Sequence, residues 1–223
     1  GDGLVMKKKL NKIIIIGLAI VMVTFIFYKK ITDNNPYNDF KNISINESLN
    51  QKDKSYYLYY YMKDCYYCNL IKEDMFNFAK KHKNIYFVDI DKYKNQRIKY
   101  DWESFNTKND KEIGYSKDGK SITYYEGESE DKYLHTKEKN KYGKTKMYEI
   151  VIADKEYKNE NKNAKLGKVY AKEIIPEIDY SKYKYGDKLI IAGSPTLLHV
   201  TNGKIDDFYF DSRDIGEYVR GEK

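Results

Sequence analysis

The chain has few cysteines, histidines and arginines, and each shortage disfavours a class of protein. Its only cysteines are Cys65 and Cys68, and its three histidines are scattered over the sequence at His82, His135 and His199. One Cys-x-x-Cys without a second pair is a poor zinc site, so we expect no metal, although two thiols and one or two imidazoles leave zinc as the minor alternative. A nucleic-acid binder concentrates basic residues on its folded domain, whereas this chain has three arginines and charges of alternating sign. Nucleic acid is therefore not expected as a partner.

The positive charge is concentrated at the start of the chain. The formal net charge is +7 at pH 7, of which six lysines and one aspartate in residues 1–30 contribute +5 and residues 31–223 the remaining +2. Four of those lysines precede an apolar run over residues 13–28 and two follow it, at Lys29 and Lys30. This asymmetry predicts a cytoplasmic N-terminus and an extracytoplasmic remainder.

The apolar run predicts a membrane anchor. Sixteen helical residues span ~24 Å, less than the ~30 Å of a bilayer core, so flanking lysines must extend toward the interface. We expect a basic cytoplasmic segment at 1–12 and a single transmembrane signal anchor at 13–30. A cleaved signal peptide is the alternative. No Ala-x-Ala-like site follows Tyr28, however, and no cysteine nearby offers a lipid attachment point.

The rest of the chain is long enough for one domain with an insertion. Residues 31–40 are polar and predict a linker, which leaves 41–223 for the domain. A short helix capped by Ser44 or Asn46 should end near Lys54. The aromatic run 56–62 has the length and continuous apolar character of a central strand buried on both faces.

A helix and a second strand should follow the aromatic run. Apolar residues from Leu70 to Ala79 recur at helical spacing, and residues 85–90 are of strand type. A strand, helix and strand in this order predict a parallel pair of strands with a crossover helix. Near the end of the chain, strands at 196–200 and 205–210 are joined by a turn containing Asn-Gly, the strongest short hairpin signal, and a last helix follows.

These elements carry a family resemblance. The Cys-Tyr-Tyr-Cys at the strand-to-helix junction, Val-Asp-Ile-Asp at 88–91, Gly-Ser-Pro-Thr at 193–196 and the closing helix resemble the thioredoxin superfamily. The lysine-led anchor, the short helix before the aromatic strand and Gly-Ser-Pro-Thr-Leu resemble the thioredoxin-like bacteriocin transport accessory proteins of Gram-positive bacteria. The resemblance covers about residues 41–91 and 188–220. It implies an α/β, thioredoxin-like fold, in which a mixed central sheet is flanked by helices and a large insertion precedes the cis-proline strand.

The spacing of the cysteines suits disulfide exchange. Positions i and i+3 of a helix lie about 5 to 6 Å apart, within the reach of a disulfide. Unpaired backbone amides at the first helical turn stabilise a thiolate, so we expect Cys65 to be the nucleophile and Cys68 to resolve the mixed disulfide. No dissociable cofactor is implied beyond this redox-active pair.

The resemblance also implies a substrate-docking role for the second motif. In the superfamily a cis proline opposite the cysteines leaves the preceding backbone free to pair with a substrate peptide, and Pro195, preceded by Ser194, matches it. We expect Ser194, Pro195, Tyr66 and Tyr67 to contact the substrate. The alternative for Pro195 is an ordinary proline at the start of an edge strand.

Four positions depart from the thioredoxin pattern. Asp64 stands where thioredoxins have tryptophan, and it would either oppose the helix field or cap the helix. Tyr66 and Tyr67 replace Gly-Pro between the cysteines. Tyr59 occupies the position of the buried carboxylate that accepts a proton in thioredoxins. The direction of electron flow is therefore left open.

The predicted insertion covers about residues 97–187. It should contain a hairpin within 113–125, a strand at 147–153 and an exposed loop at 154–168. Trp102, within it, is expected to be a packing residue. The insertion is either a tolerated surface elaboration or a cap that selects the partner.

Together these patterns predict a single-pass protein of the cell membrane with an extracytoplasmic thiol-disulfide oxidoreductase domain. Its partners would be exported cysteine-containing proteins or peptides, with a membrane redox protein as a possible further partner. The alternative is a non-enzymatic accessory protein for secretion, in which Cys65 and Cys68 form a static disulfide.

Overall fold

The computed structural model describes residues 15, 16, 18, 20–24 and 35–221, which fall into two units, 1–39 and 40–223. In the first unit the described residues up to 24 are helical, and Pro36–Asp39 form the 3-10 turn η1 within the predicted linker. The predicted segment 1–12 and both ends of the predicted anchor lie outside the described residues. Within the described ranges, no helix has the length and apolar character needed to span a bilayer.

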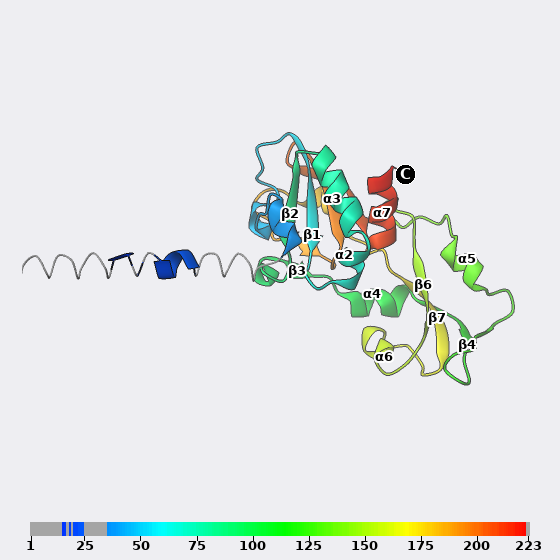
Figure 1. The fold of residues 1–223 in the computed structure, drawn as a ribbon. Coiled ribbons are helices and arrows are strands. Elements are labelled where there is room, and N and C mark those ends of the chain that lie inside the picture. The colour runs from blue at the N-terminus through cyan, green and yellow to red at the C-terminus, as the bar shows by residue number, and fades with distance from the viewer. Residues whose placement is uncertain (1–14, 17, 19, 25–34, 222–223) are drawn as a thin grey trace, which may run out of the picture. The chain divides into compact units, whose positions relative to one another are not determined.

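The second unit is a mixed α/β structure (Figure 1). Its strands are β1 (Ser55–Tyr61), β2 (Ile85–Asp89), β3 (Ile98–Lys99), β4 (Lys111–Tyr115), β5 (Thr123–Tyr124), β6 (Tyr148–Ile152), β7 (Lys168–Glu173), β8 (Ile190–Ile191), β9 (Thr196–Thr201) and β10 (Lys204–Phe210). Its helices and 3-10 turns are η2 (Ile45–Glu47), α2 (Tyr66–Leu70), α3 (Lys72–Lys81), η3 (Lys94–Gln96), α4 (Trp102–Asn109), α5 (Glu130–Leu134), α6 (Tyr157–Glu160), η4 (Tyr180–Lys182) and α7 (Ser212–Arg220).

The first sheet has the strand order β10-β9-β1-β2. Strands β1 and β2 are parallel, with Tyr57 opposite Ile85, and β9 runs antiparallel to both β1 and β10. The predicted parallel pair with a crossover helix is confirmed. The predicted hairpin is confirmed as well, because Asn202 and Gly203 have φ of 51° and 74°, the left-handed values that such a turn requires.

Strand β1 is inner and buried on both of its faces, as the aromatic run predicts. Tyr56, Leu58 and Tyr60 point to one side, where they join a core formed with the segments 45–49 and 174–192. Tyr57 and Tyr59 point to the other side, where the ring of Tyr57 lies 5.1 Å from that of Phe78 in α3. Helices α3 and α7 lie side by side over this second face (Figure 1). The core therefore extends on both sides of the sheet.

Two predicted helices differ from the observed ones. The turn η2 is capped by Ser44, whose N–H donates to the Glu47 carboxylate at 2.8 Å, and it ends at Glu47 rather than near Lys54. The predicted crossover helix is interrupted at Ile71, where φ is −111°. The buried side chain of Ile71 lies against Gly216 of α7, so tertiary packing between helices replaces the regular helix at this point.

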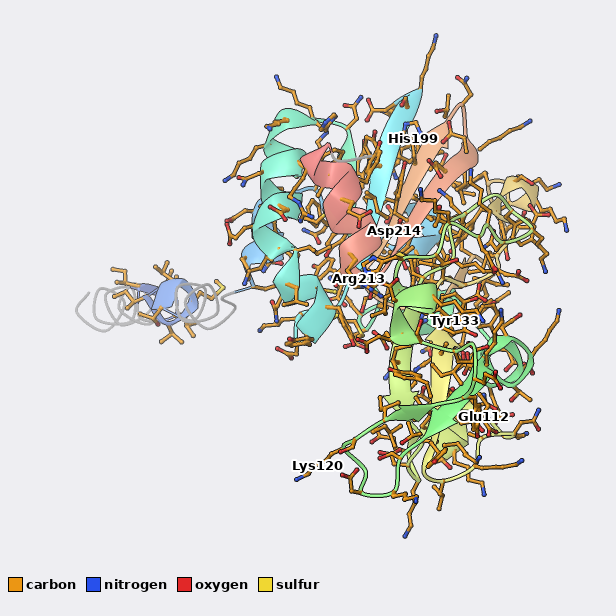
Figure 2. The ribbon with its side chains drawn as sticks, turned by 90° about the vertical axis from the view of Figure 1, so that its right-hand side faces the viewer. Glu112, Lys120, Tyr133, His199, Arg213 and Asp214 are labelled. Atoms are coloured by element: carbon orange, nitrogen blue, oxygen red, sulfur yellow. The ribbon has the colours of Figure 1, made fainter. Side chains whose placement is uncertain are left out.

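The predicted insertion folds into a second sheet with the order β5-β4-β7-β6. All its neighbouring strands are antiparallel, and its own core contains Ile113, Tyr133, Tyr148, Val169 and Ala171. The predicted hairpin and the predicted strand at 147–153 are confirmed as β4 with β5 and as β6. In Figure 2, Glu112 of β4 and Tyr133 of α5 lie in this second sheet and its core, below Arg213 and Asp214 of α7.

Most residues of 154–168 are exposed, as predicted, but the segment is not a loop throughout. The segment contains α6, and its residues Tyr157, Asn161 and Ala164 are buried. The reason is the carboxylate of Asp110 at the end of α4, which accepts hydrogen bonds from the Tyr157 hydroxyl at 2.5 Å and from the Asn161 amide at 3.2 Å. Burial raises the pKa of Asp110 to about 6. A polar residue composition therefore does not prevent burial here, because the polar groups bond to one another.

Candidate functional site

Cys65 lies at the junction that the sequence predicts, directly ahead of helix α2. It is the N-cap residue of that helix, and its sulfur accepts the backbone N–H of Cys68 at 3.2 Å. The Cys65 thiol also lies 3.4 Å from the carbonyl oxygen of Ser194, to which it donates in its protonated form. Both cysteines are thiols; Cys65 is 7 % exposed and Cys68 is fully buried beneath it. The two residues therefore share one site at the edge of the fold.

The surroundings of the two sulfurs shift their pKa values in opposite directions. A hydrogen bond from the Cys68 thiol is the largest cause that lowers the pKa of Cys65, to about 6; backbone N–H groups of Cys68 and Tyr67 add to it, and burial opposes it. The same hydrogen bond, together with burial, raises the pKa of Cys68. The thiolate at neutral pH is therefore on Cys65, the sulfur closer to the surface.

Alkylation of the reduced protein should report this difference. We expect the rate of Cys65 modification by iodoacetamide to rise with pH around a midpoint near 6 and to level off above it, because the thiolate is the reactive species. An unperturbed thiol would instead follow a midpoint of ~8.5. Cys68→Ala should move the midpoint upward, since it removes the main hydrogen bond to the thiolate. A wild-type midpoint at the unperturbed value would contradict the assignment of Cys65 as the ionised sulfur.

The second predicted motif lies against the cysteines. The peptide bond between Ser194 and Pro195 is cis, and Pro195 is buried immediately before β9. Because β9 lies between β10 and β1, the alternative of a proline on an edge strand is wrong. The contact between Cys65 and the Ser194 carbonyl brings together two motifs that are more than a hundred residues apart in the sequence.

The two tyrosines of the motif are exposed beside the thiols. Tyr66 is 70 % exposed and Tyr67 42 % exposed, and their rings meet edge to face at 5.4 Å. Asp64 is exposed and does not cap the helix, because Cys65 holds the N-cap position. Tyr59, at the position of the expected carboxylate, is fully buried. The hydrogen-bonding groups around the Cys65 sulfur therefore come from Tyr67, Cys68 and Ser194, and none of them is a carboxylate.

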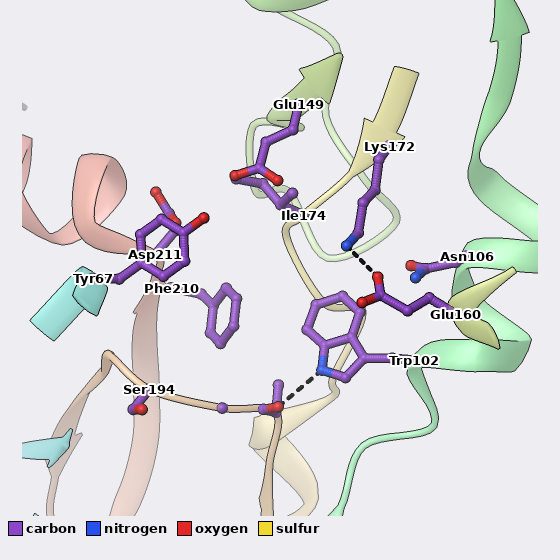
Figure 3. Close-up of a pocket in the computed structure, with 12 residues that line it drawn as sticks. Tyr67, Trp102, Asn106, Glu149, Glu160, Lys172, Ile174, Ser194, Phe210 and Asp211 are labelled. Atoms are coloured by element: carbon purple, nitrogen blue, oxygen red, sulfur yellow. Dashed lines mark hydrogen bonds and ion pairs between the residues drawn. The ribbon is translucent and has the colours of Figure 1, made fainter. Parts of the chain in front are cut away.

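A pocket of about 430 Å³ adjoins this site (Figure 3). Tyr67 and Ser194 form the side nearest the cysteines, and the insertion forms the opposite side. The residues from the insertion include Trp102, Glu149 and Lys172. Trp102 is more than a packing residue, because its indole N–H donates to the Ala192 carbonyl at 2.9 Å and its ring lines the pocket.

Of the residues that line the pocket, only Tyr67 and Ser194 are predicted site residues; the polar ones that the sequence does not indicate include Asn106, Glu149, Glu160 and Lys172. Asp211 follows strand β10 directly and caps α7, as its sequence position at the start of the last helix predicts, but that position does not indicate that it lines a pocket. Glu149 and Glu160 have no local sequence signal, because only the folding of the segment that contains them brings them to the pocket.

The three histidines lie in unrelated places. The ring of His82 stacks on Phe78 at 4.1 Å, and His199 lies 2.7 Å from a carboxylate oxygen of Asp206. His135 is an exposed neighbour of Asp131. Within the described ranges, no three side chains of His, Cys, Asp or Glu converge on a common point that could hold a metal ion.

Comparison of the chain with protein-family models, with curated proteins and with solved structures found no match.

Proposed function

We propose that this chain is a thiol-disulfide oxidoreductase with a thioredoxin-like domain, anchored in the cell membrane and acting outside the cytoplasm on exported cysteine-containing proteins or peptides. The observation that carries the proposal is the pair of sulfurs with opposite pKa shifts, one of them next to the backbone before Pro195. The thioredoxin-like assignment is supported by the parallel β1-β2 pair, the hairpin of β9 and β10, and the closing helix α7.

The first chemical step uses Cys65 as a thiolate. Its sulfur attacks one sulfur of the substrate disulfide, a new bond forms between the two, and the second substrate sulfur leaves as a thiolate that takes a proton from water. Near neutral pH, Cys65 is already ionised, so no separate base is needed for this step. The missing carboxylate at Tyr59 is consistent with such a mechanism.

The second step needs Cys68 to lose its proton. Hydrogen bonding to the Cys65 thiolate is the largest cause of its raised pKa, and that charge disappears when Cys65 enters the mixed disulfide. Cys68 then attacks the Cys65 sulfur, closes the disulfide of the pair and releases the substrate as a thiol. The pair loses two electrons and the substrate gains two. In the reverse direction the oxidised pair oxidises a substrate dithiol, and the relative reduction potentials decide which direction dominates.

Substrate docking is supported by the surroundings of the thiolate. Exposed apolar surface lies at and beside the Cys-x-x-Cys motif. It is formed by Tyr66, Tyr67 and Leu70, the last of which is 57 % exposed. Polypeptide recognition uses such surface together with free backbone groups. Ser194, Pro195 and the two tyrosines are therefore the proposed contacts.

Insulin reduction tests the proposal. With dithiothreitol as electron donor, the full chain should accelerate the reduction of insulin disulfides well above the uncatalysed rate, and Cys65→Ser should abolish this acceleration. Refolding of a reduced, disulfide-containing model protein tests the oxidative direction with the same variant. A wild-type chain inactive in both assays would contradict the proposal and favour the non-enzymatic accessory protein with a static disulfide.

A further inference from the structure

The pocket beside the cysteines has aromatic walls. The ring centroids of Trp102 and Phe210 are 5.7 Å apart, and Tyr67 adds a third ring that is shared with the Cys-x-x-Cys motif. Ser194, whose carbonyl contacts Cys65, lines the same pocket. A polypeptide whose cysteine reacts with Cys65 therefore has neighbouring side chains within reach of this pocket.

Acidic residues outnumber basic residues in the lining of the pocket. Glu149, Glu160 and Asp211 are acidic, and Lys172 is the only basic residue among those that line it. The Lys172 ammonium is bound to Glu160 at 2.5 Å, as Figure 3 shows, and the guanidinium of Arg213, outside the lining, lies 3.6 Å from Asp211. Within the described part of the chain no cation forms an ion pair with Glu149. One carboxylate thus faces the pocket without a basic partner.

A buried hydrogen-bond acceptor in the pocket is a second indication of what the pocket would bind. Asn106 of α4 is 1 % exposed and lines the pocket, yet its side-chain oxygen Oδ1 has no hydrogen-bond partner in the described structure. In Figure 3 its amide points from the helix toward the side of the pocket that holds Glu160 and Lys172. A buried acceptor without a donor costs about 1 to 3 kcal/mol, so a ligand carrying N–H groups would gain from binding there.

We propose that this pocket receives a lysine or arginine side chain of the substrate polypeptide, an inference that rests on the proposed function. This basic residue is next to the substrate cysteine that reacts with Cys65. The carboxylate of Glu149 supplies the charge, the rings of Trp102 and Phe210 accept the aliphatic stem and the cation, and Asn106 accepts a hydrogen bond. The substrates are then proteins with a basic residue near a cysteine, and the insertion is a specificity element.

The potential inside the pocket agrees with a cationic ligand. Glu149 is the largest cause that raises the pKa of the Tyr67 hydroxyl, and Asp211 contributes in the same direction. Both carboxylates thus make the loss of a proton from Tyr67 unfavourable, as expected where the field is negative. Such a field attracts a cation and repels a carboxylate.

Matched peptides test this inference. Each peptide carries one cysteine as a mixed disulfide with thionitrobenzoate, and lysine, glutamine, phenylalanine or glutamate at one neighbouring position on either side. The reduced full chain should release thionitrobenzoate from the lysine peptide about ten to a hundred times faster than from the glutamine peptide at the best position, the size of one charge-assisted hydrogen bond. The glutamate peptide should be the slowest.

Variants assign the preference to the pocket. Glu149→Gln should remove most of the ratio between the lysine and glutamine peptides, and Glu149→Lys should favour the glutamate peptide. Glu126→Gln removes an exposed carboxylate outside the pocket lining and should leave the ratio unchanged. Because each ratio is taken within one variant, changes in thiol reactivity cancel.

The outcomes separate this inference from the function on which it rests. Reaction with the neutral reagent dithiodipyridine and equal rates for all peptides would overturn the proposed pocket for a basic side chain and leave the oxidoreductase intact. Preference for phenylalanine, or a lysine preference that Glu149→Gln does not reduce, would overturn it as well. If the reduced chain reacts with neither the peptides nor dithiodipyridine at a rate above that of Cys65→Ser, the proposed function itself fails.

Discussion

The Cys68→Ser variant is expected to accumulate in cells as a mixed disulfide with its client. Attack by Cys68 is intramolecular, since Cys65 and Cys68 already share a hydrogen bond, and a well-oriented internal group outcompetes an external thiol by a large factor. Removing it should lengthen the lifetime of the adduct on the order of a thousandfold or more. Non-reducing electrophoresis should show a higher band that disappears with reductant, and mass spectrometry of that band identifies the client.

Two variants make the trapping experiment decisive. Cys65→Ser retains the Cys68 thiol and should form no adduct, because that thiol is fully buried and its burial, which remains in the variant, disfavours the thiolate. The double variant should also form none. Equal amounts of adduct from Cys65→Ser and Cys68→Ser would contradict the division of roles between the two sulfurs.

Phe87→Ala should cost about 3 to 5 kcal/mol of unfolding free energy, the usual range for a buried phenylalanine. Phe87 is fully buried in β2, between the sheet and α3. Its ring stacks on Phe40 at 4.6 Å and meets Tyr59 edge to face at 5.5 Å, with Phe76 at 6.4 Å. The truncation leaves a cavity that these rings cannot fill without breaking other contacts. Since domains have total stabilities of about 5 to 15 kcal/mol, the change is a large fraction of the whole.

Urea unfolding of the reduced full chain measures this cost. Tyr185→Ala is the matched control, because its ring is 63 % exposed and its removal should stay within about 0.5 kcal/mol of wild type. Phe87→Leu should recover part of the loss. A change below about 1 kcal/mol for Phe87→Ala would show that the aromatic cluster is not a major source of stability.

The first sheet could be predicted because its signals are local. The run of Tyr56 to Tyr61 is apolar enough to indicate an inner strand, and Asn202 with Gly203 allows a turn that few other residues form. The closing helix α7 is predicted on the same local grounds. Each of these depends on a few neighbouring residues, so the sequence alone is informative.

The second sheet was predicted only in part. Strand β7 lies between β4 and β6 in the sheet but was missed, since its sequence, Lys-Val-Tyr-Ala-Lys-Glu, alternates weakly and is stabilised by pairing on both sides. The abundance of Lys, Asn and Glu around α6 predicts exposure, which most of these side chains have, but not the helix itself. The burial of Tyr157 and Asn161 depends on Asp110, which is distant in the sequence.

The sequence by itself determined the two thiols, their spacing at a strand-to-helix junction and the proline motif at 193–196, because these features are set by adjacent residues. Only the tertiary structure decided which sulfur is ionised and what surrounds it. The contact of Cys65 with Ser194, the burial of Cys68 and the placement of Glu149 next to Tyr67 all join segments far apart in the chain. A pKa and a binding preference depend on such neighbours in space, which the order of residues does not specify locally.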